Sequence, residues 1–151
     1  MGSMNDSGVV AGPAPSRTSH THQLRGLAGT GFIATVAAMV ATVLAAALAQ
    51  AVGVDFEVPD GGETIPLSGF AVVTGFFSVV GVVMAAALLR WSARPAERFV
   101  RTAVTLTAIS LVPPVLSEAD TAITTALLGL HLVAATVMIP TLARSLRTRT
   151  D

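Results

Sequence analysis

The chain has 151 residues, of which 52% are hydrophobic and only 12% are charged, and its mean hydropathy is +0.73. A soluble domain carries about twice that charged fraction, so the composition argues against an ordinary soluble domain. The net charge is zero and cysteine is absent, which excludes a strongly basic nucleic-acid-binding protein, a disulfide framework and a thiolate metal site.

The first 25 residues form a segment rich in Gly, Pro, Ser and Thr, a composition that predicts a disordered tail. His20 and His22 lie in this tail, where solvated side chains are expected rather than metal ligands. The next segment carries no charge from residue 26 to residue 54. It could also be read as a signal peptide, because small-x-small sites occur at residues 47–49 and 49–51. However, its apolar stretch is longer than the 7–15 residues of a signal core.

Three further segments are free of charge, namely residues 64–89, 102–117 and 121–143. Crossing a hydrocarbon layer of about 30 Å takes roughly 20 apolar residues in a helix. The third segment reaches this length if its helix begins near Pro95 and Arg101 extends its side chain to the interface. The sequence therefore predicts an all-α fold, a bundle of four transmembrane helices at about 27–51, 65–89, 96–116 and 121–143. The uninterrupted apolar runs do not fit the alternation of a transmembrane β-barrel.

The arginines indicate an orientation for these helices. All nine lie before helix one, around the connection between helices two and three, or after helix four. The positive-inside rule then places both termini in the cytoplasm, and the expected location is the cell membrane, as a multi-pass protein. Six of the nine acids fall in the two arginine-free loops: Asp55, Glu57, Asp60, Glu63, Glu118 and Asp120.

Prolines mark several expected helix boundaries. Pro66 and Pro95 suit the first turn of a helix, where the missing N–H is no loss. Pro113 and Pro114 lie near the outer end of helix three and should free the carbonyls of Ile109 and Ser110. The helix would either end there with a short loop or kink and open a cavity on the outer side.

Small residues recur at helical spacing and indicate how the bundle packs. They form one stripe on helix one, at Ala34, Ala38, Ala41 and Ala45, and two pairs on helix two, Ala71 with Gly75 and Gly81 with Ala85. In lipid such residues let helices approach closely. These faces would hold the bundle together and would also allow a homo-oligomer.

The start of helix four combines acids with a local start signal. Ser117 and Asp120 have the spacing of a capping box, and Asp120 could instead be the N-cap itself. Either account needs only one acid and leaves Glu118 beside it. The segment lacks a phosphate-binding glycine loop, a serine-hydrolase elbow and a zinc-protease motif.

His131 lies ten residues inside helix four, about 15 Å along its axis and therefore near the bilayer midplane. An ionisable group at that depth should face the bundle interior and find a partner. The hydroxyl candidates are on helices two and three: Thr74, Ser78, Thr105, Thr107 and Ser110. His131 would either line a functional cavity or fix the packing of the bundle. With no second nitrogen or sulfur ligand in the helices, neither a metal site nor a cofactor is predicted.

An apolar bundle with acids at one mouth suggests one kind of chemistry. A carboxyl beside an apolar cavity can be held protonated and act as a general acid. The matching substrate would be an apolar terpenoid alkene or epoxide. Phe70 and Phe77 are seven residues apart, and their rings could stabilise a developing carbocation. The alternative is that they face lipid.

The stretch "LVPPVLSEADTAITTALLGLHLVAATVMIPTLAR", together with "VDFEVPDGGETIPL", resembles a family of small four-helix membrane proteins from actinobacteria, mostly of unknown function. The resemblance covers residues 27–147. The matching positions are Pro113, Pro114, Asp120, His131 and Pro140.

The layout is more weakly similar to bacterial integral-membrane terpene cyclases. That likeness implies a proton donor at Glu118 or Asp120, an opposing carboxyl among Glu57, Asp60 and Glu63, and His131 lining the cavity.

Two hypotheses follow for a chain made of a tail (residues 1–25), a membrane domain (26–147) and a short end (148–151). The first is a membrane terpene cyclase with Asp120, Glu118, Glu57 and Glu63 as catalytic carboxyls and with His131, Phe70 and Phe77 at an apolar substrate. The second is a non-catalytic membrane protein that binds a lipid or a partner helix. In the second, Asp120 caps a helix and His131 contributes to packing, and the surrounding partner of the spans is membrane lipid.

Overall fold

A computed structural model describes residues 17–57, 63–116 and 120–150 of the chain. It contains five helices, α1 (Arg17–Ala51), α2 (Leu67–Trp91), α3 (Pro95–Ser110), α4 (Val112–Leu116) and α5 (Thr121–Arg147), and within the described residues no strand. Four segments are long and apolar enough to cross a membrane, with α3 and α4 together forming the third. The prediction of an all-α bundle of four spanning helices is confirmed, and the protein is a multi-pass membrane protein.

The helix boundaries follow the predictions closely in the middle of the chain and less well at its start. α3 begins at Pro95 and α5 at Thr121, as expected, whereas α2 begins two residues late because Pro66 is the N-cap rather than a first-turn residue. α1 begins at Arg17, so residues 17–25, predicted to be part of a disordered tail, are helical. The first 16 residues of that predicted tail lie outside the described residues.

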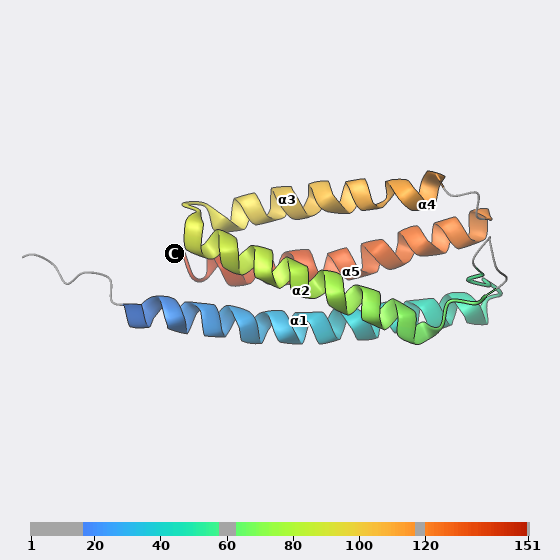
Figure 1. The fold of residues 1–151 in the computed structure, drawn as a ribbon, viewed down its shortest axis with the longest axis horizontal. Coiled ribbons are helices and arrows are strands. Elements are labelled where there is room, and N and C mark those ends of the chain that lie inside the picture. The colour runs from blue at the N-terminus through green and yellow to red at the C-terminus, as the bar shows by residue number, and fades with distance from the viewer. Residues whose placement is uncertain (1–16, 58–62, 117–119, 151) are drawn as a thin grey trace, which may run out of the picture.

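The third span is interrupted just before its two prolines. α3 ends at Ser110, and the N–H of Leu111 bonds to the carbonyls of Thr107 at 3.1 Å and Ala108 at 3.3 Å. The helix then resumes as α4, which contains Pro113 and continues toward the same end of the molecule (Figure 1). The outcome lies between the two predicted alternatives, because the span is broken but not ended there.

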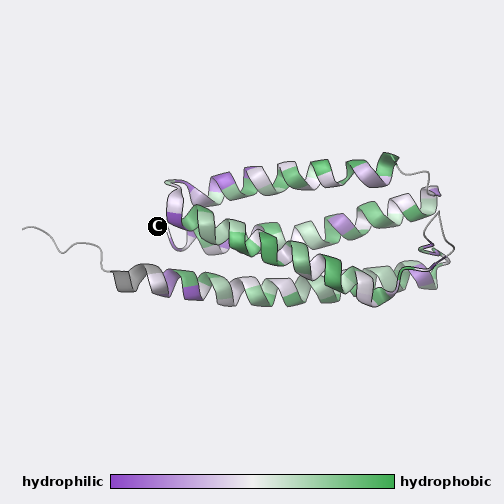
Figure 2. Ribbon diagram, viewed as in Figure 1, coloured by the Kyte–Doolittle hydropathy of each residue, from purple (hydrophilic) through white to green (hydrophobic). Residues whose placement is uncertain are grey.

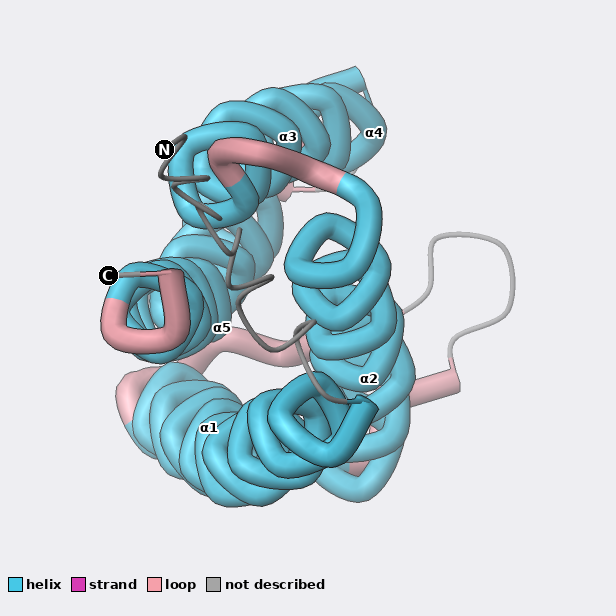
Figure 3. Tube along the Cα trace, turned by 90° about the vertical axis from the view of Figure 1, so that its left-hand side faces the viewer, coloured by secondary structure: helices cyan, strands magenta, loops and turns pink. Residues whose placement is uncertain are grey.

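The spans are arranged as a four-cornered bundle. Viewed along the helices, α1, α2, α3 and α5 follow one another around the bundle, so that α1 and α3 lie at opposite corners (Figure 3). Apolar residues run along the middle of every span, and hydrophilic residues concentrate toward the helix ends and the connections (Figure 2). Because lipid surrounds such a bundle, large apolar side chains such as Phe32, Leu44 and Phe76 remain exposed on its outer surface.

The small-residue faces are used inside the chain, where α1 packs against α2. Ala34 and Ala38 are buried, and the buried stripe continues through Thr42 and Ala46 rather than through Ala41 and Ala45. A Cβ added to Gly31 would lie 2.6 Å from Cγ2 of Val82, so the two helices approach as closely as a glycine permits. These contacts confirm that small residues set the packing.

The buried residues form two groups, one toward each end of the bundle. The larger group joins all four spans and includes Leu27, Phe99, Leu142 and Leu146. The smaller group consists of Ala46, Phe56 and Leu130. Phe56 belongs to the connection between α1 and α2, so this connection contributes a core residue to the bundle.

Candidate functional site

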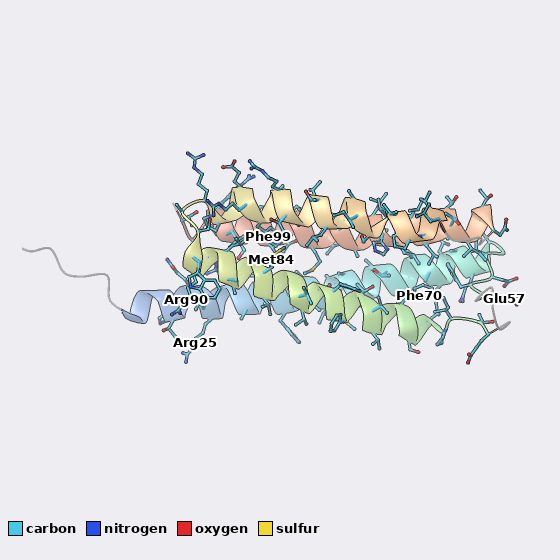
Figure 4. All side chains as sticks on the ribbon, turned by 45° about the horizontal axis from the view of Figure 1, so that its top comes forward. Arg25, Glu57, Phe70, Met84, Arg90 and Phe99 are labelled. Carbon is cyan, nitrogen blue, oxygen red and sulfur yellow. The ribbon has the colours of Figure 1, made fainter. Side chains whose placement is uncertain are left out.

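The arginines and the acids gather at opposite ends of the bundle. Arg25 and Arg90 lie at one end and Glu57 at the other (Figure 4). We call the first the arginine-rich end, which includes Arg94, Arg101, Arg144, Arg147 and Arg149, and the second the acidic end, formed among the described residues by Asp55, Glu57, Glu63 and Asp120. Of the sequence candidates for catalysis, those that the structure describes, Glu57, Glu63 and Asp120, belong to the acidic end.

A hairpin-like turn carries two of these acids. The N–H of Gly53 bonds to the carbonyl of Gln50 at 3.0 Å, and the N–H of Val54 bonds to that of Ala49 at 3.0 Å. This pair of bonds, with φ of +95° at Gly53, ends α1 in a Schellman motif. Glu57 then pairs through its backbone with Thr64, which holds Glu57 and Glu63 near each other with both side chains exposed.

Asp120 occupies the N-cap of α5, which is one of the two arrangements that the sequence predicts for the start of this helix. Its backbone carbonyl accepts the N–H of Thr124 at 2.9 Å, but its side chain makes no capping hydrogen bond. The carboxylate is exposed beside the positive end of the helix, which favours a negative charge. Ser117 and Glu118, the other members of this candidate cluster, lie outside the described residues.

The two phenylalanines predicted to line one cavity have different surroundings. Phe70 packs against Phe56 with ring centroids 4.9 Å apart in an edge-to-face arrangement, and Phe56 is fully buried. Phe77 is 65% exposed and contacts Phe76, with ring centroids 5.4 Å apart. The structure therefore does not bring Phe70 and Phe77 to a common cavity. Sequence reasoning overlooked Phe56, and its only signal was a lone aromatic residue in a polar loop.

His131 lies on the surface of the chain. The expectation that it turns into the bundle interior is wrong, because its side chain is exposed. It makes no hydrogen bond or ion pair with any described residue, and Ser78, one of its predicted partners, is buried elsewhere. The hydroxyl of Ser110, another predicted partner, donates to the carbonyl of Thr107 at 2.8 Å.

The acidic end therefore does not converge on a reaction centre in the part of the chain that the structure describes. There, no hydrogen bond or ion pair joins Glu57, Glu63 and Asp120 to one another. The described residues also contain no group of three or more histidine and acidic side chains that could hold a metal. The ion pairs found among them involve Glu97 at the arginine-rich end.

The arginine-rich end contains a pocket that sequence reasoning overlooked. It lies between the start of α3 and the end of α5, and Arg94, Arg101 and Arg147 are among its lining residues. In the sequence, these arginines indicated only an orientation. Arg147 lies 46 residues after Arg101 and 53 after Arg94, so their sharing of one site could not be seen from the sequence.

Comparison with known proteins identifies a family but no activity. Residues 22–148, most of the chain, match a group described as a family of unknown function (DUF6069). Neither a curated protein nor a solved structure gives a significant match. The family match supports the resemblance to small membrane proteins, whereas the actinobacterial origin and the likeness to terpene cyclases stay predictions.

Proposed function

The chain belongs to DUF6069, a family of unknown function, and from this premise we propose that it is a non-catalytic membrane protein whose α5 binds a partner helix, supplied by a second copy of the chain. The observation that carries the proposal is the exposed position of His131, near the middle of a membrane span. An ionisable side chain at that depth is costly in lipid unless it finds a polar partner, and the described part of this chain offers it none.

An exposed face of α5, about a third of a turn around the helix from His131, suits a close helix contact. Thr125, Gly129, Leu132 and Thr136 are exposed and recur every three or four residues, so they share one face. A Cβ added to Gly129 would meet nothing within 4 Å, which leaves room for a neighbouring backbone. Small and hydroxyl-bearing residues are the typical contacts between helices in membranes. The other small-residue faces, around Gly31 and Ala38, are occupied within the chain.

A second copy is the simplest partner for this face. Most homo-oligomers are symmetric, and a two-fold contact places the same patch of both copies together. His131 lies about 100° around the helix from Leu132 and therefore at the edge of such a contact. A neutral imidazole donates at one nitrogen and accepts at the other, so a hydroxyl of the partner helix can satisfy it.

The terpene-cyclase hypothesis receives no support from the arrangement of its residues. A carboxyl serves as a general acid near neutral pH when apolar surroundings disfavour its charged form. Glu57, Glu63 and Asp120 are exposed instead. The hypothesis would regain ground if membranes containing the protein converted a prenylated or epoxyprenylated aromatic into a product of equal mass and the Asp120→Asn variant did not.

We also propose that the arginine-rich end faces the cytoplasm and that the protein resides in the cell membrane, because arginines are retained on the cytoplasmic side of membrane proteins. Single cysteines at Thr150 and at Glu63, introduced separately into this cysteine-free chain, test the orientation. An impermeant thiol reagent added to intact cells should label the second and not the first. Labelling of the cysteine at Thr150 alone would invert the orientation.

Disulfide crosslinking in native membranes tests the partner-helix proposal. Leu132→Cys places a thiol on the proposed contact face, and Val79→Cys places one at an exposed, similarly central position of α2 as the control. A disulfide requires Cα atoms within about 7 Å, so oxidation should give a covalent dimer from Leu132→Cys only. Adding His131→Leu to that variant should reduce the dimer fraction. Equal crosslinking at both positions, or none at Leu132→Cys, would refute a second copy bound through α5.

A further inference from the structure

A pocket of about 600 Å³ lies at the arginine-rich end, between the first turn of α3 and the last turn of α5. Its lining residues include three arginines, Arg94, Arg101 and Arg147, one acidic residue, Glu97, and one apolar residue, Val100. An open pocket lined by three arginines and an apolar wall differs from an arginine cluster on a flat surface, because it provides both an anion-binding surface and a concave apolar contact.

The charges of the pocket leave a positive excess. The carboxylate of Glu97 contacts the guanidinium of Arg101 at 3.1 Å and that of Arg94 at 3.6 Å. These contacts draw the two guanidinium groups toward one carboxylate, while the guanidinium of Arg147 makes no hydrogen bond or ion pair with a described residue. Among the described lining residues, three positive charges against one negative charge leave two in excess. A guanidinium fork matches the oxygens of a phosphate in a two-point contact.

The backbone adds donors on the same side of the pocket. Arg94 is the N-cap of α3 and Pro95 is its first residue, and no side chain caps this end. The first N–H groups of a helix have no partner within the helix and attract anions. Because Pro95, Ala96 and Glu97 line the pocket, this helix start faces it and reinforces the effect of the arginines.

The depth of the pocket matches that of lipid headgroups. Trp91, the last residue of α2, is 76% exposed, and exposed tryptophan at the end of a membrane span marks the interface with water. The first lining residue, Ala93, follows two positions later. On the membrane side, Val100 lines the pocket and Val104, one turn farther along α3, is exposed. An apolar track for an acyl chain therefore continues from the charged site.

We infer that this pocket binds the phosphate group of an anionic phospholipid, with Arg94, Arg101 and Arg147 around the phosphate and an acyl chain along α3. Basic pockets between membrane helices at the interface bind lipid headgroups through the same combination of charge and apolar contact. The site lies at the C-terminal end of α5, whereas His131 lies near the middle of that helix. The lipid inference therefore does not depend on the partner-helix proposal. Failure of either one leaves the other standing.

Native mass spectrometry of the detergent-solubilised protein, titrated with phosphatidylglycerol or phosphatidylcholine, tests the inference. Phosphatidylglycerol should bind at lower concentration than phosphatidylcholine. Arg147→Gln should raise the phosphatidylglycerol concentration needed for half-saturation about tenfold, as expected for loss of a charge-assisted hydrogen bond. Arg144→Gln is the matched control, because Arg144 carries the same charge one turn earlier on α5 and is not among the lining residues.

Glu97→Gln tests the inference through tighter lipid binding, a result that misfolding of the variant would not produce. Removing this carboxylate frees Arg94 and Arg101 from their ion pairs, so phosphatidylglycerol should bind more tightly than to the parent. Equal weakening by Arg147→Gln and Arg144→Gln would show only general attraction of a basic surface and would overturn the site. Displacement of the lipid by millimolar inorganic phosphate would assign the pocket to a soluble phosphate and overturn the lipid assignment.

Discussion

The close approach of α1 and α2 at Gly31 gives the sharpest prediction about how this bundle is held together. In Gly31→Ala, the new Cβ would lie 2.6 Å from Cγ2 and 2.8 Å from Cγ1 of Val82. Carbon atoms in proteins pack at about 3.5–4.0 Å, so one of the two helices must shift. The side chain of Val82 cannot easily relieve the clash, because a β-branched residue in a helix is nearly confined to one rotamer.

The magnitude follows from comparison with a glycine on the same helix. Overpacking a tight contact costs about 1–3 kcal/mol, whereas replacing glycine by alanine inside a helix gains about 1 kcal/mol. Gly31→Ala should therefore lower the free energy of unfolding by up to about 2 kcal/mol. Gly29→Ala has the same helical gain but meets nothing within 4 Å. The two variants should differ by about 1–3 kcal/mol, which is the cost of the contact alone.

Unfolding of each variant in mixed micelles, followed by circular dichroism as the denaturing detergent increases, measures these differences. Val82→Ala removes both clashing methyl groups and leaves only Cβ, at 3.3 Å from the new methyl. In that background, Gly31→Ala should change the free energy of unfolding nearly as Gly29→Ala does, and the double-mutant cycle gives the coupling energy. Equal stability of Gly31→Ala and Gly29→Ala in the parent background would refute the close packing of α1 against α2 at this point.

Two further predictions concern the connection between α1 and α2 and use the same unfolding measurement. Gly53→Ala should destabilise the protein by about 1–2 kcal/mol, because a side chain strains the left-handed backbone at φ of +95°. Gly53→Asn should cost less, since asparagine tolerates this conformation better than alanine does. Equal losses of stability in the two variants would contradict this reason. Phe56→Ala should cost about 3–5 kcal/mol, since its ring is fully buried against Phe70. Phe77→Ala, which removes a ring that is 65% exposed, should cost much less, and a similar cost for both would show that Phe56 does not stabilise the acidic end.

The exposed position of His131 could not be predicted from the sequence. The composition of α5 places an ionisable residue near the middle of a span, and from that alone a partner is required. Which side of the helix carries it cannot be read from the pattern, because large apolar residues occur both on the buried side of α5, at Leu130, and on its exposed side, at Leu132. In a soluble protein, the polar face of an amphipathic helix shows which side is exposed to solvent. In a helix surrounded by lipid, apolar residues suit the exposed side as well as the buried side.

The same limit applies to the small residues and to the arginines. Their spacing predicted close helix contacts, but only the structure pairs Gly31 with Val82 and Gly75 with Met39. The arginines predicted an orientation, but Arg94 and Arg147 come from helix ends far apart in the sequence, and their common pocket depends on α3 lying beside α5.

The sequence by itself determined the number, type and approximate limits of the spans. Each of these depends on one local requirement, that a segment free of charge and about 20 residues long must satisfy its own backbone hydrogen bonds in lipid. The tertiary structure alone decided which faces meet, including the exposure of His131, the burial of Phe56 and the assembly of the arginine-lined pocket. These follow from how helices distant in sequence pack side by side, and interchangeable apolar faces do not encode that arrangement locally.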